Sequence, residues 1–335
     1  MATKGYNNES ISALKGPDRV RLRPAAILGS DGLEGCEHTF IEILANSIDE
    51  AREGYGKVIE VTRYKDQSIM IRDYGRGCPV DFNEKEQRFN WELVYCELYA
   101  GGKYQNNTGE NYEYSLGLNG LGSCATQYSS EYMDVTVFKD GYRYDLHFEK
   151  GYNIGGLKKE PCQYKQSGTQ QRWKPDLEVF TDINIPLEFF TTVLKKQAVV
   201  NAGLRFQLYD EASDQRFTFL YENGITDYVR EIDEEKGITG VQYYETATKG
   251  RDRADKPEYK VKMQIAFCFN NQTNLIEYYH NSSYLENGGS PDKAVKQAFV
   301  SQIDTYLRQN NKYLKNESKL KFEDVESSLV LISSS

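Results

Sequence analysis

Three polar side chains recur at helical spacing in the segment 37–53. Glu42, Asn46 and Asp49 stand at i, i+4 and i+7, so they share one stripe of a helix. A carboxylate on this stripe can orient and deprotonate an attacking water, and the amide oxygen of Asn46 can ligate Mg²⁺. A magnesium ion held mostly by phosphates and waters needs only one or two protein oxygens. A solvated polar face is the alternative interpretation of the triplet.

A further carboxylate ends an alternating apolar segment. Ile69, Ile71 and Asp73 point to one face of the strand expected at 68–73. If that face is inward, Asp73 needs a partner, because an unpaired buried charge is costly. The exocyclic amine of adenine would serve, and so would an arginine or a cap on the following turn. The glycines and the proline in 75–79 favour a ligand, because glycine lets the backbone approach it closely and proline fixes the exit of the turn.

Glycines open and close a polar segment at 101–122. It begins with Gly101, Gly102 and Lys103 and ends with a run of glycines, leucines and an asparagine: Gly117, Leu118, Asn119, Gly120, Leu121 and Gly122. Backbone N–H groups of such glycines can point at phosphate oxygens, the start of the helix after Gly122 adds its positive end, and Lys103 adds a point charge. The pattern is neither a Walker loop nor a dinucleotide fingerprint. A flexible surface loop is the alternative.

Periodicity predicts the elements that must position these groups. Apolar residues at helical spacing predict a helix over 37–53, with Phe40, Ile43, Leu44, Ile48 and Ala51 facing a core. Alternation and turn signals predict strands at 58–63, 68–73, 132–138, 142–148 and 260–270. Further helices are expected at 91–100, from 123 and at 291–314, and a loop at 246–258. The first domain ends near 217–224, so the chain reads as an α/β sandwich followed by a smaller α/β domain.

Composition narrows the classes of function. The 335 residues carry a net charge of -9, which argues against a surface that grips DNA directly, although the chain can act on DNA through a partner. The six cysteines form no Cys-x-x-Cys pair, so we expect free thiols in a reducing cytoplasm and no zinc site. We find neither a signal peptide nor an apolar run long enough to span a membrane.

Taken together and in this order, the helix carboxylate, the strand-end aspartate with its glycines and the glycine-rich segment resemble the GHKL ATPases. Among these, the match is narrower to the B subunits of bacterial type II DNA topoisomerases. The stretch 42–51 resembles their N-box helix, 73–79 their adenine motif and 98–104 the start of their ATP lid. Ser167-Gly168-Thr169 resembles the strand that closes the adenine pocket, and 280–290 the segment before the long helix of the transducer domain.

The resemblance implies an α+β fold, in which a GHKL (Bergerat) ATPase sandwich is followed by a smaller α/β transducer domain. It implies an N-terminal dimerisation arm at 1–16, an ATP-binding domain at 17–225 and a transducer domain at 226–335. Tyr6 and Ile11 fall where contacts of the arm would lie.

The resemblance also assigns roles, with ATP and Mg²⁺ as the cofactors. Glu42 would be the general base for the attacking water, Asn46 would bind Mg²⁺, and Asp49 belongs to the same nucleotide-binding helix. Asp73 would hold the adenine amine, Thr169 would support it through water, and Gly77 would leave room for the base. The phosphates would be held by the remaining candidates, with Tyr112 a further nucleotide contact: Gly101, Gly102, Lys103, Gly117, Leu118, Asn119, Gly120, Leu121 and Gly122.

Partners follow from the same resemblance. We expect ATP to close a homodimer, a gyrase A-type subunit to complete the enzyme, DNA to be handled by the full enzyme, and no membrane association. The function implied is ATP-driven strand passage and supercoiling in the cytoplasm, with DNA cleavage residues absent from this chain.

Departures from the family pattern keep alternatives open. Asn119 and Tyr99 stand where histidine is usual, and Cys78 replaces an isoleucine. No Gln-Thr-Lys sequence occurs, so we expect the transducer to stop before its lysine loop. A nucleotide-gated dimerisation module without turnover is therefore the alternative. A histidine kinase is disfavoured, because none of His38, His147 and His280 lies in a dimerisation helix.

Overall fold

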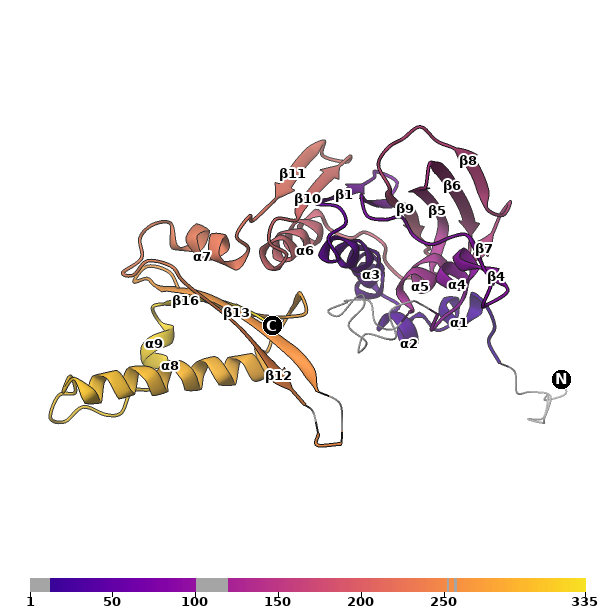
Figure 1. Cartoon of the computed structure of the whole chain (residues 1–335). Helices are drawn as coiled ribbons and strands as arrows, with labels where there is room; N and C mark the ends of the chain where they lie inside the picture. Colours follow the sequence, from indigo (N-terminus) through magenta and orange to yellow (C-terminus); the bar gives the residue numbers. More distant parts are fainter. Residues whose placement is uncertain (1–12, 101–119, 252, 256–257) are drawn as a thin grey trace. The chain divides into compact units, whose positions relative to one another are not determined.

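A computed structural model gives the structure of the chain and describes residues 13–100, 120–251, 253–255 and 258–335 (Figure 1). Contacts divide the chain into two compact units. The first comprises Met1–Thr191 and Gln207–Thr218, and the second comprises Thr192–Phe206 and Phe219–Ser335. This division by contacts falls at other residues than the expected domain limits, which lie between residues 16 and 17 and between residues 225 and 226. Those limits stay a prediction.

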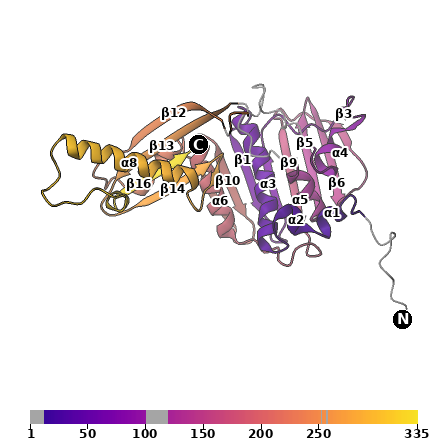
Figure 2. The ribbon, with the colours of Figure 1, turned by 90° about the horizontal axis from the view of Figure 1, so that it is seen from below.

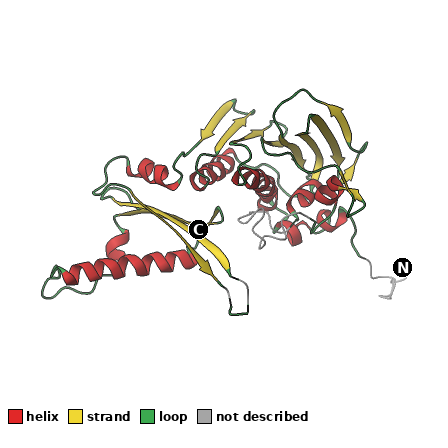
Figure 3. Cartoon of the chain, in the orientation of Figure 1, coloured by secondary structure: helices red, strands yellow, loops and turns green. Residues whose placement is uncertain are grey.

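The first unit is built on a sheet that has nine strands within the described ranges (Figure 3). Its strand order is β11-β10-β1-β2-β9-β5-β6-β7, and β8 also pairs with β6. The strands expected at 58–63, 68–73, 132–138 and 142–148 are all present. A separate hairpin, β3 (Phe82–Asn83) with β4 (Arg88–Phe89), follows β2. The bounds of the sheet strands are β11 (Gln215–Phe219), β10 (Arg205–Asp210), β1 (Val58–Arg63), β2 (Ile69–Asp73), β9 (Gly168–Pro175), β5 (Ser130–Lys139), β6 (Tyr142–Glu149), β7 (Tyr152–Asn153) and β8 (Lys158–Pro161).

Alternation within the central strands separates the two faces of this sheet. In β2, Ile69, Ile71 and Asp73 are buried, whereas the residues between them are half-buried. The neighbouring strand β9 follows the same period, and its Trp173 is fully buried. Trp173 pairs with Ile69 across the antiparallel ladder. A period of two therefore places the residue that ends β2, the aspartate, on the face that the helices cover.

Helices cover this inward face. Seen from below, α3 and α5 lie across the same side of the central strands (Figure 2). The apolar stripe expected on α3 is buried at Phe40, Ile43, Leu44 and Ile48, and the ring of Phe40 packs edge-on against Phe190 with 4.8 Å between centroids. The helices of this unit include α1 (Asp18–Arg21), α2 (Pro24–Leu28), α3 (Leu33–Arg52), α4 (Asn90–Cys96), α5 (Gly122–Tyr128) and α6 (Leu187–Val200), of which α6 continues into the second unit.

The second unit has its own sheet and core. Its strands run in the order β12-β13-β16-β14-β15. Tyr278, Val295 and Leu331 belong to a buried cluster that joins the sheet to α8. The elements are α7 (Ile225–Asp233), β12 (Gln242–Gly250), β13 (Tyr259–Phe269), β14 (Leu275–His280), β15 (Ser283–Tyr284), α8 (Gly289–Gln309), α9 (Glu323–Glu326) and β16 (Leu329–Ser334).

Three boundaries differ from the sequence prediction. The helix expected at 91–100 ends at Cys96, and Tyr99 has a φ of 63°, which a helix cannot accommodate. The loop expected at 246–258 begins later, because residues 246–250 continue β12 and pair with β13. The exposed side chains of Thr248 and Lys249 fit an edge strand, where polar side chains discourage pairing with other chains. The helix expected at 291–314 is α8, which ends at Gln309.

Two further expectations concern chemistry outside the site. The six cysteines are free thiols, as expected from their scatter. Among the described residues, no helix is long and apolar enough to cross a membrane.

Trp173 allows a test of the packing of the first unit. We expect Trp173→Ala to lower the free energy of unfolding by roughly 3–5 kcal/mol, because it empties a fully buried site and removes the hydrogen bond from Nε1 to the Thr39 hydroxyl. Urea unfolding followed by circular dichroism measures the change. Leu177→Ala is the control, since Leu177 is 66% exposed and its loss should matter little. Equal stability of the two variants would contradict this account of the core.

Candidate functional site

Glu42 lies in the middle of α3, on the helix face that meets the start of α5. One carboxylate oxygen lies 3.0 Å from Nε2 of His38, one turn earlier in the helix. This hydrogen bond raises the pKa of His38. A Cβ built on Gly122 would lie 2.1 Å from the other carboxylate oxygen, Oε2. A side chain at position 122 would therefore displace the Glu42 carboxylate from this position.

Asn46 lies one turn after Glu42 and faces the same end of α5. Its Nδ2 donates a hydrogen bond of 3.2 Å to the hydroxyl of Ser123. This contact fixes the orientation of the carboxamide, so that its oxygen is the atom able to ligate a cation. The described residues contain no group of three His, Cys, Asp or Glu side chains that could hold a metal by themselves. A site with one amide oxygen fits Mg²⁺ that phosphates and water hold on its other sides.

Asp49 completes the expected stripe but has a different environment. Its side chain is buried, and its charge acts on Arg52 at the end of the helix, where it opposes the lowering of the pKa that burial causes. Its part in nucleotide binding stays a prediction.

The Asp73 carboxylate lies at the inward end of β2 and is only 7% exposed. Its Oδ1 accepts hydrogen bonds from the backbone N–H of Gly75, at 2.9 Å, and of Thr169, at 3.2 Å. Its Oδ2 accepts a bond of 3.3 Å from the hydroxyl of Ser47 on α3. The bond from Gly75 is the turn cap that the sequence left open as an alternative. These donors are neutral, so they hold Asp73 without cancelling its charge.

Burial dominates the ionisation of this group. It raises the pKa of Asp73 to about 6, and the nearby charge of Glu50 acts in the same direction. The three hydrogen bonds oppose the rise because they favour the charged form. A carboxylate that has lost its water and is held by neutral donors is suited to accept a hydrogen bond from a neutral amine of a ligand.

The loop after β2 is held close to the strand β9. A Cβ on Gly168, whose φ is +144°, would lie 2.1 Å from the backbone oxygen of Asp73, so only glycine allows this approach. Next to it, the hydroxyl of Ser167 donates to the oxygen of Gly75 at 2.6 Å. Arg76 on this loop forms a bidentate ion pair with Glu50 of α3, with distances of 2.9 and 3.0 Å. The loop is thereby fixed to both the sheet and the helix.

Cys78 follows Gly77 in the loop after β2 and is bound by Thr169 of β9. Gly77 has a φ of +84°, and a Cβ there would lie 2.9 Å from the oxygen of Phe138. The hydroxyl of Thr169 accepts a bond of 2.8 Å from the backbone N–H of Cys78. These contacts keep the backbone of the loop near Asp73. They also exclude a side chain at position 77, because a Cβ there would be too close to Phe138.

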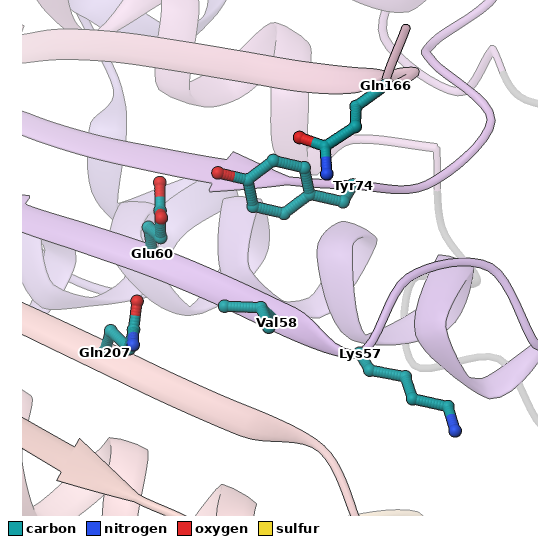
Figure 4. Close-up of a pocket in the computed structure, with 6 residues that line it drawn as sticks. All are labelled: Lys57, Val58, Glu60, Tyr74, Gln166 and Gln207. Carbon is teal, nitrogen blue, oxygen red and sulfur yellow. The ribbon is translucent and has the colours of Figure 1, made fainter.

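The opposite face of the sheet carries an open pocket behind the end of β2. It has a volume of about 350 Å³ and is lined by Glu60, Tyr74 and Gln207, with Lys57, Val58 and Gln166 around them (Figure 4). Burial, together with a hydrogen bond to Glu60, raises the pKa of Tyr74 to about 12. Since strand residues alternate, Tyr74 points to this pocket whereas Asp73 points to the inward site.

The structure brings most of the described candidates into two clusters joined by one helix. Glu42 and Asn46 meet the start of α5, where Gly120, Leu121 and Gly122 lie, and Asp73 meets Gly77 and Thr169 at the ends of β2 and β9. The helix α3 joins the clusters, because Ser47 follows Asn46 directly and binds Asp73. The other candidates lie outside the described residues: Gly101, Gly102, Lys103, Tyr112, Gly117, Leu118 and Asn119.

Sequence reasoning missed the side chains that support this arrangement. His38 stands at i−4 from Glu42, so helical spacing could have identified it. Ser123 and Ser47 give no such signal, because a serine in a helix has many roles. The pair of Glu50 and Arg76 joins segments that only the fold brings together.

The chain is similar to known proteins along nearly its whole length. Residues 224–335 match the family model described as DNA gyrase B. Over 98% of its length, the chain is 29% identical to the DNA gyrase B subunit of Thermotoga maritima and 31% identical to the DNA topoisomerase 4 B subunit of Bacillus subtilis, of which it spans 51% and 48%. Over 98% of its length it is also 32% identical to the DNA gyrase B subunit of Spiroplasma citri, of which it spans 50%. The chain thus spans about half the length of the curated relatives it matches.

Solved structures show the same fold. The crystal structure of the 43K ATPase domain of Thermus thermophilus gyrase B in complex with an aminocoumarin superposes with a TM-score of 0.73 and 25% identity, over 96% of this chain and 81% of that one. The topoisomerase IV ATP binding domain of Francisella tularensis gives a TM-score of 0.69 at 24% identity, over 96% and 82%. The α+β fold expected from the GHKL resemblance is confirmed.

The pKa of Asp73 predicts a pH dependence of stability. The value is about 6 in the folded chain and 3.8 for an unperturbed side chain, so between these pH values the folded state holds a proton that the unfolded state has released. Stability contributed by this group is therefore fully present below about pH 3.8 and is lost as the pH rises through 6. We expect Asp73→Asn to become more stable relative to the unsubstituted protein by roughly 2–3 kcal/mol between pH 4 and pH 7. Parallel urea unfolding curves that keep a constant difference across this range would contradict the assignment.

Proposed function

We propose that this chain belongs to the family of DNA gyrase and topoisomerase IV B subunits, that it binds ATP in the site around Asp73 and that it hydrolyses ATP at Glu42. The observation that carries the proposal is that α3 bears groups suited to both tasks. Glu42 and Asn46 face the glycines before α5, and Ser47, the next residue, binds the desolvated carboxylate of Asp73.

Asp73 recognises the base in this proposal. Its carboxylate accepts a hydrogen bond from the exocyclic amine of adenine, while Gly75 and Thr169 hold it from behind. The absence of a side chain at Gly77 lets the loop pack closely against Phe138 of β5 and so keeps the loop backbone beside Asp73. Thr169 supports the base through water, with its hydroxyl already fixed by the backbone of Cys78.

Hydrolysis takes place in the middle of α3, at Glu42. Glu42 accepts a proton from the attacking water, and His38 orients its carboxylate through the bond between Nε2 and Oε1. The amide oxygen of Asn46 would hold Mg²⁺, which would neutralise phosphate charge when it is bound. Gly120, Leu121 and Gly122 offer backbone N–H groups to the phosphates, and the glycine-rich segment at 101–119 completes their binding.

The second part of the proposal concerns how ATP binding is coupled to a larger assembly. We infer that ATP closes a dimer of B subunits and that the second unit, as a transducer, passes this closure to a gyrase A-type partner that handles DNA. Strand passage is the activity of that full assembly. Support comes from the match of residues 224–335 to the DNA gyrase B model and from relatives of both the gyrase and the topoisomerase IV kind.

Glu42→Ala tests the catalytic assignment. We expect phosphate release to fall by roughly 10²–10⁴-fold, because the water loses its general base, while the Kd for ATP changes little. Phosphate release and calorimetric binding are measured on the same preparation. Glu34→Ala, a glutamate in the first turn of the same helix, is the matched control and should hydrolyse ATP as the unsubstituted protein does. Unchanged turnover in Glu42→Ala would remove the residue from the mechanism.

Asp73→Asn tests recognition of the base. The neutral amide is a weaker acceptor, so the Kd for ATP should rise by roughly tenfold to a hundredfold. In the unsubstituted protein, affinity should also fall below about pH 6, where Asp73 takes up a proton. Asp66→Asn, in the exposed turn before β2, is the control. Calorimetry that gives equal affinities for both variants, with no pH dependence, would reject the adenine assignment.

A further inference from the structure

One polar side chain lies within an otherwise apolar part of the inward sheet face. Gln171 follows Thr169 on the same face of β9 and is 5% exposed. Its neighbours across the ladders are Ile71 of β2 and Val135 of β5. A carboxamide among such residues lowers stability unless both its oxygen and its nitrogen find partners. The position therefore needs an explanation beyond packing.

The oxygen of this carboxamide is bound within the protein. Tyr95 of α4, itself fully buried, donates its hydroxyl to Oε1 of Gln171 at 3.3 Å. The same hydroxyl is hydrogen-bonded to the thiol of Cys78 on the loop after β2. The resulting sequence of contacts, Cys78 to Tyr95 to Gln171, fixes the side chain and leaves its Nε2 hydrogens as the donors that a ligand can use.

Gln171 also lies beside the carboxylate assigned to the base. Asp73 accepts a hydrogen bond from the backbone N–H of Thr169. Thr169 is two residues before Gln171, so the side chains of these two residues lie on the same face of the strand. Because Gln171 pairs with Ile71, two residues before Asp73 on the same face, an acceptor at the end of β2 and a donor within β9 lie on neighbouring positions of the inward face. Resting on the nucleotide binding proposed above, we propose that Gln171 donates its carboxamide N–H to a ring nitrogen of adenine that flanks the amine held by Asp73.

The chemistry of the purines makes this contact selective. Adenine places a donor, its exocyclic amine, between two acceptors, the ring nitrogens N1 and N7. Guanine has an acceptor oxygen in place of the amine, so Asp73 would face a group of its own kind. If the contact of Gln171 is to N1, Gln171 would do so as well, because N1 of guanine carries a hydrogen, whereas N7 is an acceptor in both purines. A site whose polar groups are left unpaired by the wrong ligand rejects it more strongly than an apolar pocket does. With a contact to N1, Gln171 is thus a specificity-determining residue for adenine, and with a contact to N7 it adds affinity while Asp73 sets the choice of base.

Base analogues with Gln171→Met provide the test. Methionine keeps the length of the side chain and removes the amide. Calorimetry measures ATP, 1-deaza-ATP and 7-deaza-ATP on both proteins. We expect the unsubstituted protein to bind one deaza analogue about tenfold more weakly than ATP, and Gln171→Met to bind ATP about tenfold more weakly with no further loss for that analogue. The analogue that loses affinity identifies the ring nitrogen.

Gln170→Met is the matched control. Gln170 is on the same strand, but its neighbours are Arg72 and Thr136 on the opposite face, so this variant should discriminate the analogues as the unsubstituted protein does. Tyr95→Phe keeps the buried ring and releases the carboxamide, and should reduce the same discrimination. It decides the question if Gln171→Met does not fold.

The outcomes separate the two proposals. If the unsubstituted protein binds ATP but does not distinguish either analogue from it, or if both variants retain the full discrimination, Gln171 does not contact the base and the inference is wrong. If the unsubstituted protein binds no ATP at all, the proposed function fails and this inference fails with it.

Discussion

The structure of the site depends on the desolvation of one carboxylate. Asp73 lies at the end of a buried strand, and it is held by two backbone N–H groups and one hydroxyl. Such donors are fixed by the fold and cannot move away as a lysine side chain can. The close approach of Gly168 to the backbone of Asp73 sets the distance between β2 and β9 at this point. Much of the local geometry follows from three requirements on the Asp73 carboxylate: it is shielded from water, its position is fixed by hydrogen bonds, and it can still accept one more hydrogen bond.

A single helix then determines how far the proposed site of base recognition lies from the proposed site of hydrolysis. Ser47 binds Asp73, and Glu42 lies five residues earlier on α3, so the rise of about 1.5 Å per residue separates them by less than about 10 Å along the axis. Because the apolar stripe of α3 is buried against the sheet and α6, this separation is set by packing and not by the ligand. Under the proposed function, this arrangement favours ligands whose reactive group lies at a fixed distance from the recognised ring.

Periodicity and motif spacing predicted the parts of this structure that depend on local sequence. Helical spacing identified α3 and its buried stripe, and alternation identified β1, β2, β5 and β6. The same alternation placed Asp73 on the inward face. Sequence could not predict which donors would meet that carboxylate, because Thr169 is 96 residues away and reaches it only through strand pairing. Ser47, Ser123 and the pair of Tyr95 and Gln171 escaped prediction for the same reason, since their roles arise from tertiary contacts.

The strand order of the first unit has a consequence for dividing the protein. β10 pairs with β1, yet most of β10 and β11 follows the segment Thr192–Phe206, which belongs to the second unit. A fragment cut after residue 191 would lose these two strands and expose the hydrogen-bonding edge of β1, with Ile59 and Val61 beside it. Open edges of this kind pair with other chains. The first unit therefore cannot be isolated by one cleavage near its last helix without becoming prone to aggregate, and a stable fragment must extend at least to residue 219, where β11 ends.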